Sequence, residues 1–224
     1  MLTFWPENYT VTYEGRANYK GQQLNSGITI ELENQHQAEQ YALHLGGRIP
    51  LVKGEVFASG RQRKNGWSMG KAGFSFGTLL SRTKTTNVLV DEHVNHAIVT
   101  AKDGTESVKS LMVGEPVFDD LSAIVAIQAR LFELMQRGQT LPDQIELQLV
   151  DTNSAGLVSI QLAADQMVQT ALGADPHGVL AQWQRLGSAV AVWYDSRLQF
   201  KPVQVQFKST SKQIEFMLSA VAFA

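Results

Sequence analysis

The sequence predicts a mainly β protein, with a large curved antiparallel sheet or open β-barrel wrapped around one main amphipathic helix. Three observations lead there: apolar and polar residues alternate along most of the chain, turn-forming residues separate the alternating stretches, and one segment has helical spacing instead. Strands with one apolar and one polar face belong in antiparallel sheets that cover a core with one side. Roughly ten or more strands must curl or close rather than stay flat.

Five stretches show the alternation most clearly. Their apolar positions are Tyr9, Val11 and Tyr13; Ile28, Ile30 and Leu32; Ile145, Leu147 and Leu149; Val203, Val205 and Phe207; and Ile214, Phe216 and Leu218. Turns are expected at Asn25-Ser26-Gly27, Asn65-Gly66, Asp103-Gly104 and Asn153-Ser154-Ala155-Gly156. These residue types favour the short hairpin connections of a meander.

One segment departs from the alternation and predicts the main helix, residues 120–136. Its apolar residues, from Leu121 to Met135, recur at helical spacing. Asp119 or Asp120 can cap the first amides, and Gly138 can end the helix. A shorter helix is expected near residues 177–186. Because the loops are short and no repeat or linker interrupts the chain, we expect one domain over residues 1–224.

Composition excludes several classes of function. The 224 residues are 44% hydrophobic and 18% charged, with a net charge of −2, which is typical of a globular protein and lacks the basic surface of a nucleic-acid-binding one. Without cysteine there is no disulfide, iron–sulfur cluster, thiolate zinc site or cysteine nucleophile. No apolar run reaches transmembrane length, the N-terminus lacks the pattern of a signal peptide, and no cofactor is expected.

Residues 73–77, GFSFG, match the G-x-S-x-G nucleophile elbow of serine hydrolases. A true elbow follows a buried parallel strand and opens a helix, and neither flank of this stretch has that character. Asp91, Asp151 or Asp165 could precede His177 in the order of a triad, but no βαβ alternation brings them together. We therefore predict a bent β-segment, with Phe74 and Phe76 facing one way and Ser75 the other.

Two further clusters of polar residues are better explained by local structure than by a metal site or a catalytic pair of carboxylates. Residues 91–96, DEHVNH, gather metal-capable side chains, but His93 and His96 differ by three positions and face opposite sides of a strand. A surface hairpin tip between strands near 87–90 and 97–100 is favoured over a metal site. The adjacent Asp119 and Asp120 suit the start of a helix, and adjacent carboxylates cannot flank a glycosidic bond.

Aromatic residues are the remaining candidates. Trp67, Phe74, Phe76 and Trp193 are predicted to bind a ligand, with ordinary core packing as the alternative for each. Trp5, between Phe4 and Pro6, is expected only to anchor the N-terminus.

Four stretches together resemble the domain-of-unknown-function 3108 family of bacterial envelope proteins. They are residues 8–15 (NYTVTYEG), 117–123 (VFDDLSA), 192–195 (VWYD) and 201–205 (KPVQV). The resemblance implies an exported, periplasmic, β-rich domain whose signal peptide is absent from this sequence, and it implies no known reaction. The shared pattern positions are Asp119, Leu121, Ser122, Trp193, Asp195 and Pro202. Asp120 stands where the family usually has proline, and the segment near Trp67 matches only loosely.

The function expected from these observations is non-enzymatic: an envelope protein that binds a lipid or other apolar or amphiphilic molecule, or an envelope partner protein, on a curved β-sheet. A serine esterase that uses Ser75 is one alternative. The other is a structural assembly subunit, which a long exposed edge strand would favour.

Overall fold

The structure is a computed structural model that describes residues 4–19, 21–49, 52–64, 66–78, 84–91, 93–170, 173–209 and 214–224. These residues form a 15-stranded sheet and one α-helix, α1 (Asp120–Gln136), together with the short 3-10 turns η1 (His36–Ala38) and η2 (Ser196–Leu198). The strands are β1 (Tyr9–Tyr19), β2 (Gln22–Gln35), β3 (Gln40–Ile49), β4 (Val52–Arg63), β5 (Gly66–Thr78), β6 (Lys84–Asp91), β7 (His96–Thr100), β8 (Glu106–Ser110), β9 (Val117–Phe118), β10 (Gln144–Val150), β11 (Ala155–Thr170), β12 (Gly173–Arg185), β13 (Ser188–Asp195), β14 (Lys201–Ser209) and β15 (Ile214–Phe223).

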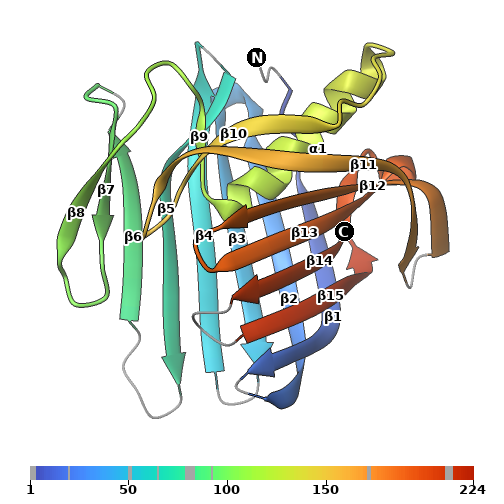
Figure 1. The fold of residues 1–224 in the computed structure, drawn as a ribbon, viewed down its shortest axis with the longest axis horizontal. Helices are drawn as coiled ribbons and strands as arrows, with labels where there is room; N and C mark the ends of the chain where they lie inside the picture. Colours follow the sequence, from blue (N-terminus) through green and yellow to red (C-terminus); the bar gives the residue numbers. More distant parts are fainter. Residues whose placement is uncertain are drawn as a thin grey trace.

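The sheet is an open, curved meander in two halves. Its strand order is β8-β7-β6-β5-β4-β3-β2-β1-β15-β14-β13-β12-β11-β10-β9, and every neighbouring pair is antiparallel except β9 and β10. The first and last strands, β1 and β15, join the halves. Figure 1 shows the strands of the two halves running in different directions, with β10–β15 in front and α1 between them. The predicted fold class is confirmed.

Period-two alternation determines which side chains face α1. The five predicted alternating stretches lie in β1, β2, β10, β14 and β15, as expected. Val11, Leu149 and Val203 are fully buried on the side of the sheet that faces the helix, which we call the inner face. The polar residues between them lie on the outer face. Side chains from both halves therefore share one hydrophobic core around α1.

The helix begins and ends where the sequence predicts. Asp119 is the N-cap: its carboxylate accepts a hydrogen bond from the Ser122 amide at 2.8 Å, and the Ser122 hydroxyl accepts one from the Asp119 amide at 2.9 Å. This reciprocal pair is a capping box. At the other end Gly138 has a φ of 61°, and its amide and that of Gln139 donate to carbonyls of the last turn, which is a Schellman motif.

The predicted shorter helix near residues 177–186 is wrong, because this segment belongs to strand β12. Val179, Ala181 and Trp183 are buried, whereas Gln182 and Gln184 are exposed, which is a period of two rather than of 3.6. The expected start signal was also misleading. Gly173 and Pro176, which resembled the start of a helix, lie inside the strand.

Three of the four predicted turns separate strands, and one does not. Gly66 and Gly104 have positive φ values of 110° and 86° at the β4–β5 and β7–β8 connections, and residues 151–154 link β10 to β11. Asn65 lies outside the described residues. The turn expected at Asn25-Ser26-Gly27 is wrong: these residues run through β2.

Within the described residues, no helix combines the length and the apolar character that crossing a membrane requires.

Candidate functional site

An apolar pocket of about 340 Å³ lies on the inner face beside the N-terminal half of α1. This volume falls in the range of small-molecule pockets, about 300–1,000 Å³. Strands from both halves of the sheet build its walls. Its lining residues are Tyr13, Ile28, Ile30, Leu45, Val56, Phe74, Val190, Val205, Phe207, Phe216 and Leu218 from the sheet, and Asp120, Leu121 and Ile124 from the helix.

The helix is held in a position that leaves this pocket open. The hydroxyl of Tyr194 donates to the Ile124 carbonyl at 2.9 Å, and that of Tyr9 donates to the Gln128 side chain at 2.8 Å. Burial raises the pKa of both tyrosines well above the ordinary value, so these phenols stay protonated donors. Because both bonds are buried, they fix α1 at a defined place over the sheet.

The polar atoms at the pocket are already engaged. The Tyr13 hydroxyl donates to the Pro202 carbonyl at 2.7 Å, and the Asp120 carboxylate accepts from the Trp183 indole nitrogen at 3.0 Å. The remaining surface is aliphatic and aromatic, including the rings of Phe207 and Phe216, stacked with centroids 5.2 Å apart. Such a surface favours an apolar chain or ring over a polar group.

A second cavity, of about 490 Å³, adjoins the pocket and has a different chemical character. The two share the lining residues Val56, Phe74, Asp120, Leu121 and Phe207. The ammonium of Lys102 lies 5.9 Å from the centroid of the Phe74 ring, at the boundary between them. The polar residues that line this second cavity, the polar chamber, are Thr86, Lys102, Asp119, Asp120, Asp151, Thr152, Asn153, Ser188 and Ser209.

Asp119 gives the polar chamber a titratable group near neutral pH. Burial raises the pKa of its carboxyl to about 6, although hydrogen bonds from Ser122 oppose the shift. Asp151 is held differently: it accepts bonds from the amides of Asn153 and Ser154 and pairs with Arg185 at 3.4 Å. The chamber therefore contains one carboxylate held by an ion pair and two backbone amides, and one whose pKa is raised by burial.

The four residues predicted to bind a ligand lie in different places. Phe74 lines both the pocket and the polar chamber. Trp67 is buried, 3% exposed, and is absent from the pocket wall. Trp193 is partly buried and lies next to Tyr194, which points to α1, so alternation turns Trp193 toward the outer face. Phe76 belongs to β5, and its side chain is outside the described residues.

Trp67 belongs instead to a closed aromatic cluster at the other end of the inner face. Trp5 stacks on Tyr41, Trp67 and Phe118, with ring centroids 4.4, 5.4 and 6.4 Å apart. Trp5 is 2% exposed, so it does more than anchor the N-terminus. It fills the space that β3, β5 and β9 would otherwise leave beneath the start of the helix.

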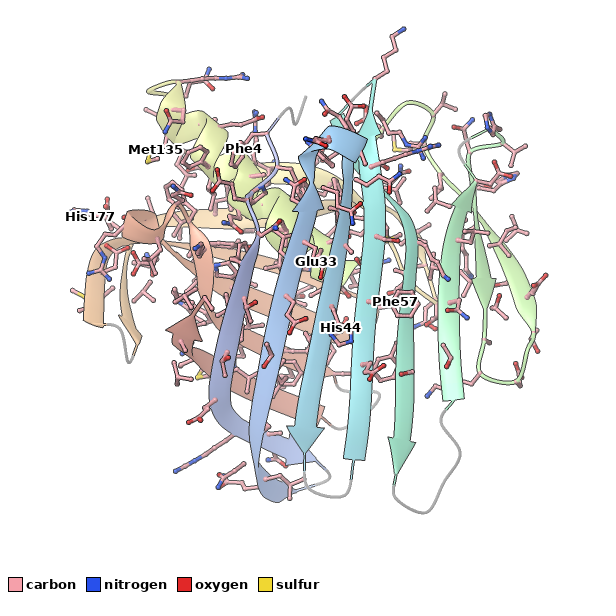
Figure 2. All side chains as sticks on the ribbon, turned by 180° about the vertical axis from the view of Figure 1, so that it is seen from behind. Phe4, Glu33, His44, Phe57, Met135 and His177 are labelled. Carbon is pink, nitrogen blue, oxygen red and sulfur yellow. The ribbon has the colours of Figure 1, made fainter. Side chains whose placement is uncertain are left out.

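GFSFG forms part of β5, as predicted, and the structure does not bring its serine to His177. Ser75 sits in mid-strand, paired with Glu55 and Thr85 on the neighbouring strands. The Nδ1 atom of His177 lies 3.1 Å from the Asp165 carboxylate, and both side chains are exposed on β11 and β12. Figure 2 shows His177 on the opposite side of the molecule from Phe57, which is on the strand next to β5.

The first glycine of GFSFG has a packing role on the outer face. A Cβ atom on Gly73 would collide with the Phe57 ring and approach the Asn87 side chain to 2.9 Å. Glycine therefore lets an aromatic side chain of the neighbouring strand lie flat across β5.

Asp91 and residues 93–96 lie at the predicted hairpin tip. Asp91 ends β6 and pairs with His96 at the start of β7, and the Asp91 carboxylate accepts a bond from the His93 amide at 3.0 Å. Glu92 lies outside the described residues. No group of three or more histidine, cysteine or acidic residues that could hold a metal occurs in the part of the chain that is described.

Comparison with known proteins identifies the fold only. A β-barrel-like protein of the domain of unknown function DUF1849 from Brucella abortus matches with a TM-score of 0.60 and 10% sequence identity, covering 100% of this chain and 98% of its own. A DUF1329 family protein from Desulfovibrio piger covers 97% of this chain and 85% of its own, with 9% identity and a TM-score of 0.25. No protein-family model and no curated protein sequence matches the chain.

Proposed function

We propose that this protein is a non-enzymatic binding protein that holds a small amphiphilic molecule between its sheet and its helix. The apolar part of the ligand lies in the pocket, and its polar part lies in the adjoining polar chamber. One observation carries the proposal: the inner face keeps an apolar pocket of about 340 Å³ beside a helix whose position is fixed by buried hydrogen bonds.

The chemistry of the two cavities sets the class of ligand. Each buried methylene contributes about 0.8 kcal/mol, or roughly a fourfold gain in affinity. Affinity should therefore rise with chain length until the pocket is full and then level off. A polar group on the same molecule would enter the polar chamber past Phe74 and Asp120, where it finds hydroxyl, amide and carboxylate partners rather than hydrocarbon.

Location in the bacterial envelope is part of the proposal and is supported by the motif resemblance alone. The assembly-subunit alternative depended on a long exposed edge strand. The two edges of the sheet are short: β8 has five residues and β9 has two. The β9 edge is also held by Ser68, whose hydroxyl accepts a bond from the Val117 amide at 3.1 Å. Ligand binding therefore remains the function that the geometry supports best.

A titration with octanol, decanol and dodecanol, followed by native mass spectrometry and by the shift in melting temperature, tests the proposal. We expect affinity to increase along the series for the wild type. Ile28→Trp replaces an aliphatic side chain by a bulky indole that fills part of the pocket, and it should abolish binding. The matched control is Ile98→Trp, because Ile98 is a partly exposed residue on the outer face of β7. The absence of binding to the wild type, or equal binding by Ile28→Trp, would overturn the proposal.

A further inference from the structure

A second depression lies on the opposite side of the sheet, on the outer face of β11–β14, and it encloses about 650 Å³. These strands are in front of α1 in Figure 1. The depression, which we call the glutamine trough, exists because short and long side chains alternate across the strands. Ala189 and Ala191 of β13 form its floor, while longer polar side chains rise from the strands on either side.

The strand register places the walls of the trough. Ala191 pairs with Gln182 of β12 on one side and with Gln206 of β14 on the other. Ala189 pairs in the same way with Gln184 and Lys208. Paired residues on neighbouring strands share one face of a sheet, so these four long side chains stand in two facing rows.

The walls consist mainly of primary amides, and two of these are free. Gln206 donates to the Glu215 carboxylate at 3.3 Å, and Lys208 pairs with the same carboxylate at 3.9 Å. Within the described part of the chain, the side chains of Gln182 and Gln184 make no hydrogen bond. Among the described residues that line the trough none is acidic, and the single cation, Lys208, is already paired.

An amide offers two donors and one acceptor side by side, and a hydroxyl group also donates and accepts. A hydroxyl-rich neutral molecule can therefore satisfy several of these amides at once. An anion would find only a paired lysine. A hydrocarbon would bury free amides without partners, which costs free energy.

The trough also has an apolar surface on which a sugar ring can pack. Leu157, at one wall, is 45% exposed. Trp193 lies two residues beyond Ala191 on the same face of β13, next to the trough rather than in its lining. The carbon-bound hydrogens of a pyranose can pack against an exposed apolar side chain such as Leu157, while its hydroxyls face the amides. We infer that the glutamine trough binds a neutral oligosaccharide, at a site independent of the apolar pocket.

An array of neutral and acidic glycans, followed by calorimetric titration of maltoheptaose and chitohexaose, provides the test. The full chain should bind neutral glycans, and each lost amide should weaken binding by about fivefold. Gln182→Ala removes one free, exposed amide without touching the core. Ala191→Leu fills the floor and should abolish binding, whereas Ala222→Leu, an exposed alanine on β15 outside the trough, should not.

Two results would overturn the inference. One is the absence of binding to any neutral glycan. The other is glycan binding that Gln182→Ala and Ala191→Leu leave unchanged, which would place the glycan elsewhere on the protein. Because Ile28→Trp alters only the inner face, it should leave glycan binding intact. The glutamine trough and the apolar pocket can thus fail separately.

Discussion

The two ends of the inner face are built by the same strands yet differ in one respect: one end is filled and the other is open. On β3, Tyr41 lies in the aromatic cluster, and Leu45, four residues later on the same face, lines the apolar pocket. On β5, Trp67 likewise lies in the aromatic cluster and Phe74 lines the apolar pocket. The strands that build an end therefore do not decide whether a pocket forms there. What decides is whether another segment covers the strand end.

The covering segment at the filled end is the stretch before β1. The amide of Phe4 donates to the Glu133 carboxylate at 2.8 Å, which ties this stretch to α1. The side chain of Asn34 donates to the Pro6 carbonyl at 2.9 Å, which ties it to β2. These two hydrogen bonds hold Trp5 where its ring stacks on those of Tyr41 and Trp67. Among the described residues, the lining of the pocket at Ile28 and Leu45 comes from the sheet and from α1, and none of it comes from the stretch before β1.

Removing the residue that fills the closed end should have the largest effect. Trp5→Ala leaves a cavity among fully packed aromatic rings, and we expect a loss of about 3–5 kcal/mol in the free energy of unfolding, measured in urea. A loss below about 1 kcal/mol would show that Trp5 does not fill this end.

A comparable truncation at the open end should cost less. Phe216 is partly buried and already faces the pocket on one side, so Phe216→Ala should lower the free energy of unfolding by about 1–3 kcal/mol. The same urea titration measures it. If both truncations cost the same, the distinction between a filled and an open end is wrong.

The smallest expected change in the free energy of unfolding comes from the titration of Asp119, which lies at the boundary between the two ends. Its pKa is raised from 3.8 to about 6 in the folded protein, so the folded state binds the proton more tightly than the unfolded state. The stability this group contributes is present below pH 3.8 and is lost as the pH rises to about 6.

Asp119→Asn keeps a capping side chain and removes the titration. The free energy of unfolding of the wild type, relative to this variant, should fall by about 1–2 kcal/mol between about pH 4 and pH 7. Denaturation with urea at several pH values measures the difference. A difference that rises with pH would contradict the burial of this carboxyl.

Local signals in the sequence were sufficient for most of the fold. The helix over residues 120–136 is predictable because the cap, the apolar spacing and the terminal glycine agree with one another. Residues 177–186 carried a competing signal, since Gly173 and Pro176 resemble a helix start, and tertiary pairing with β11 and β13 overrode it. Asn25-Ser26-Gly27 lies in a strand for the same reason. Strand β1 pairs with these three residues and continues to pair with β2 on both sides of them.

The site was predicted less well, for a physical reason. Alternation placed Ile28 and Phe216 on the core face, and Phe74 was expected at a ligand, but no local pattern tells which core residues border empty space. That depends on where α1 and the residues before β1 come to rest. Polar sequence neighbours on both sides of Trp67 and Trp193 predict a binding rim. Trp67 is nevertheless buried in the aromatic cluster and Trp193 faces outward, so polar neighbours do not identify a binding residue.

The pairing of β1 with β15 also sets the order of events during folding. Val11 pairs with Phe223, and Thr10 and Ala224 exchange two backbone hydrogen bonds, so this seam closes a loop of nearly the whole sequence. Contacts between such distant residues form slowly. The apolar pocket takes walls from both sides of the seam, so it exists only after the halves have met. A molecule bound there would hold the halves together and stabilise only the completed sheet.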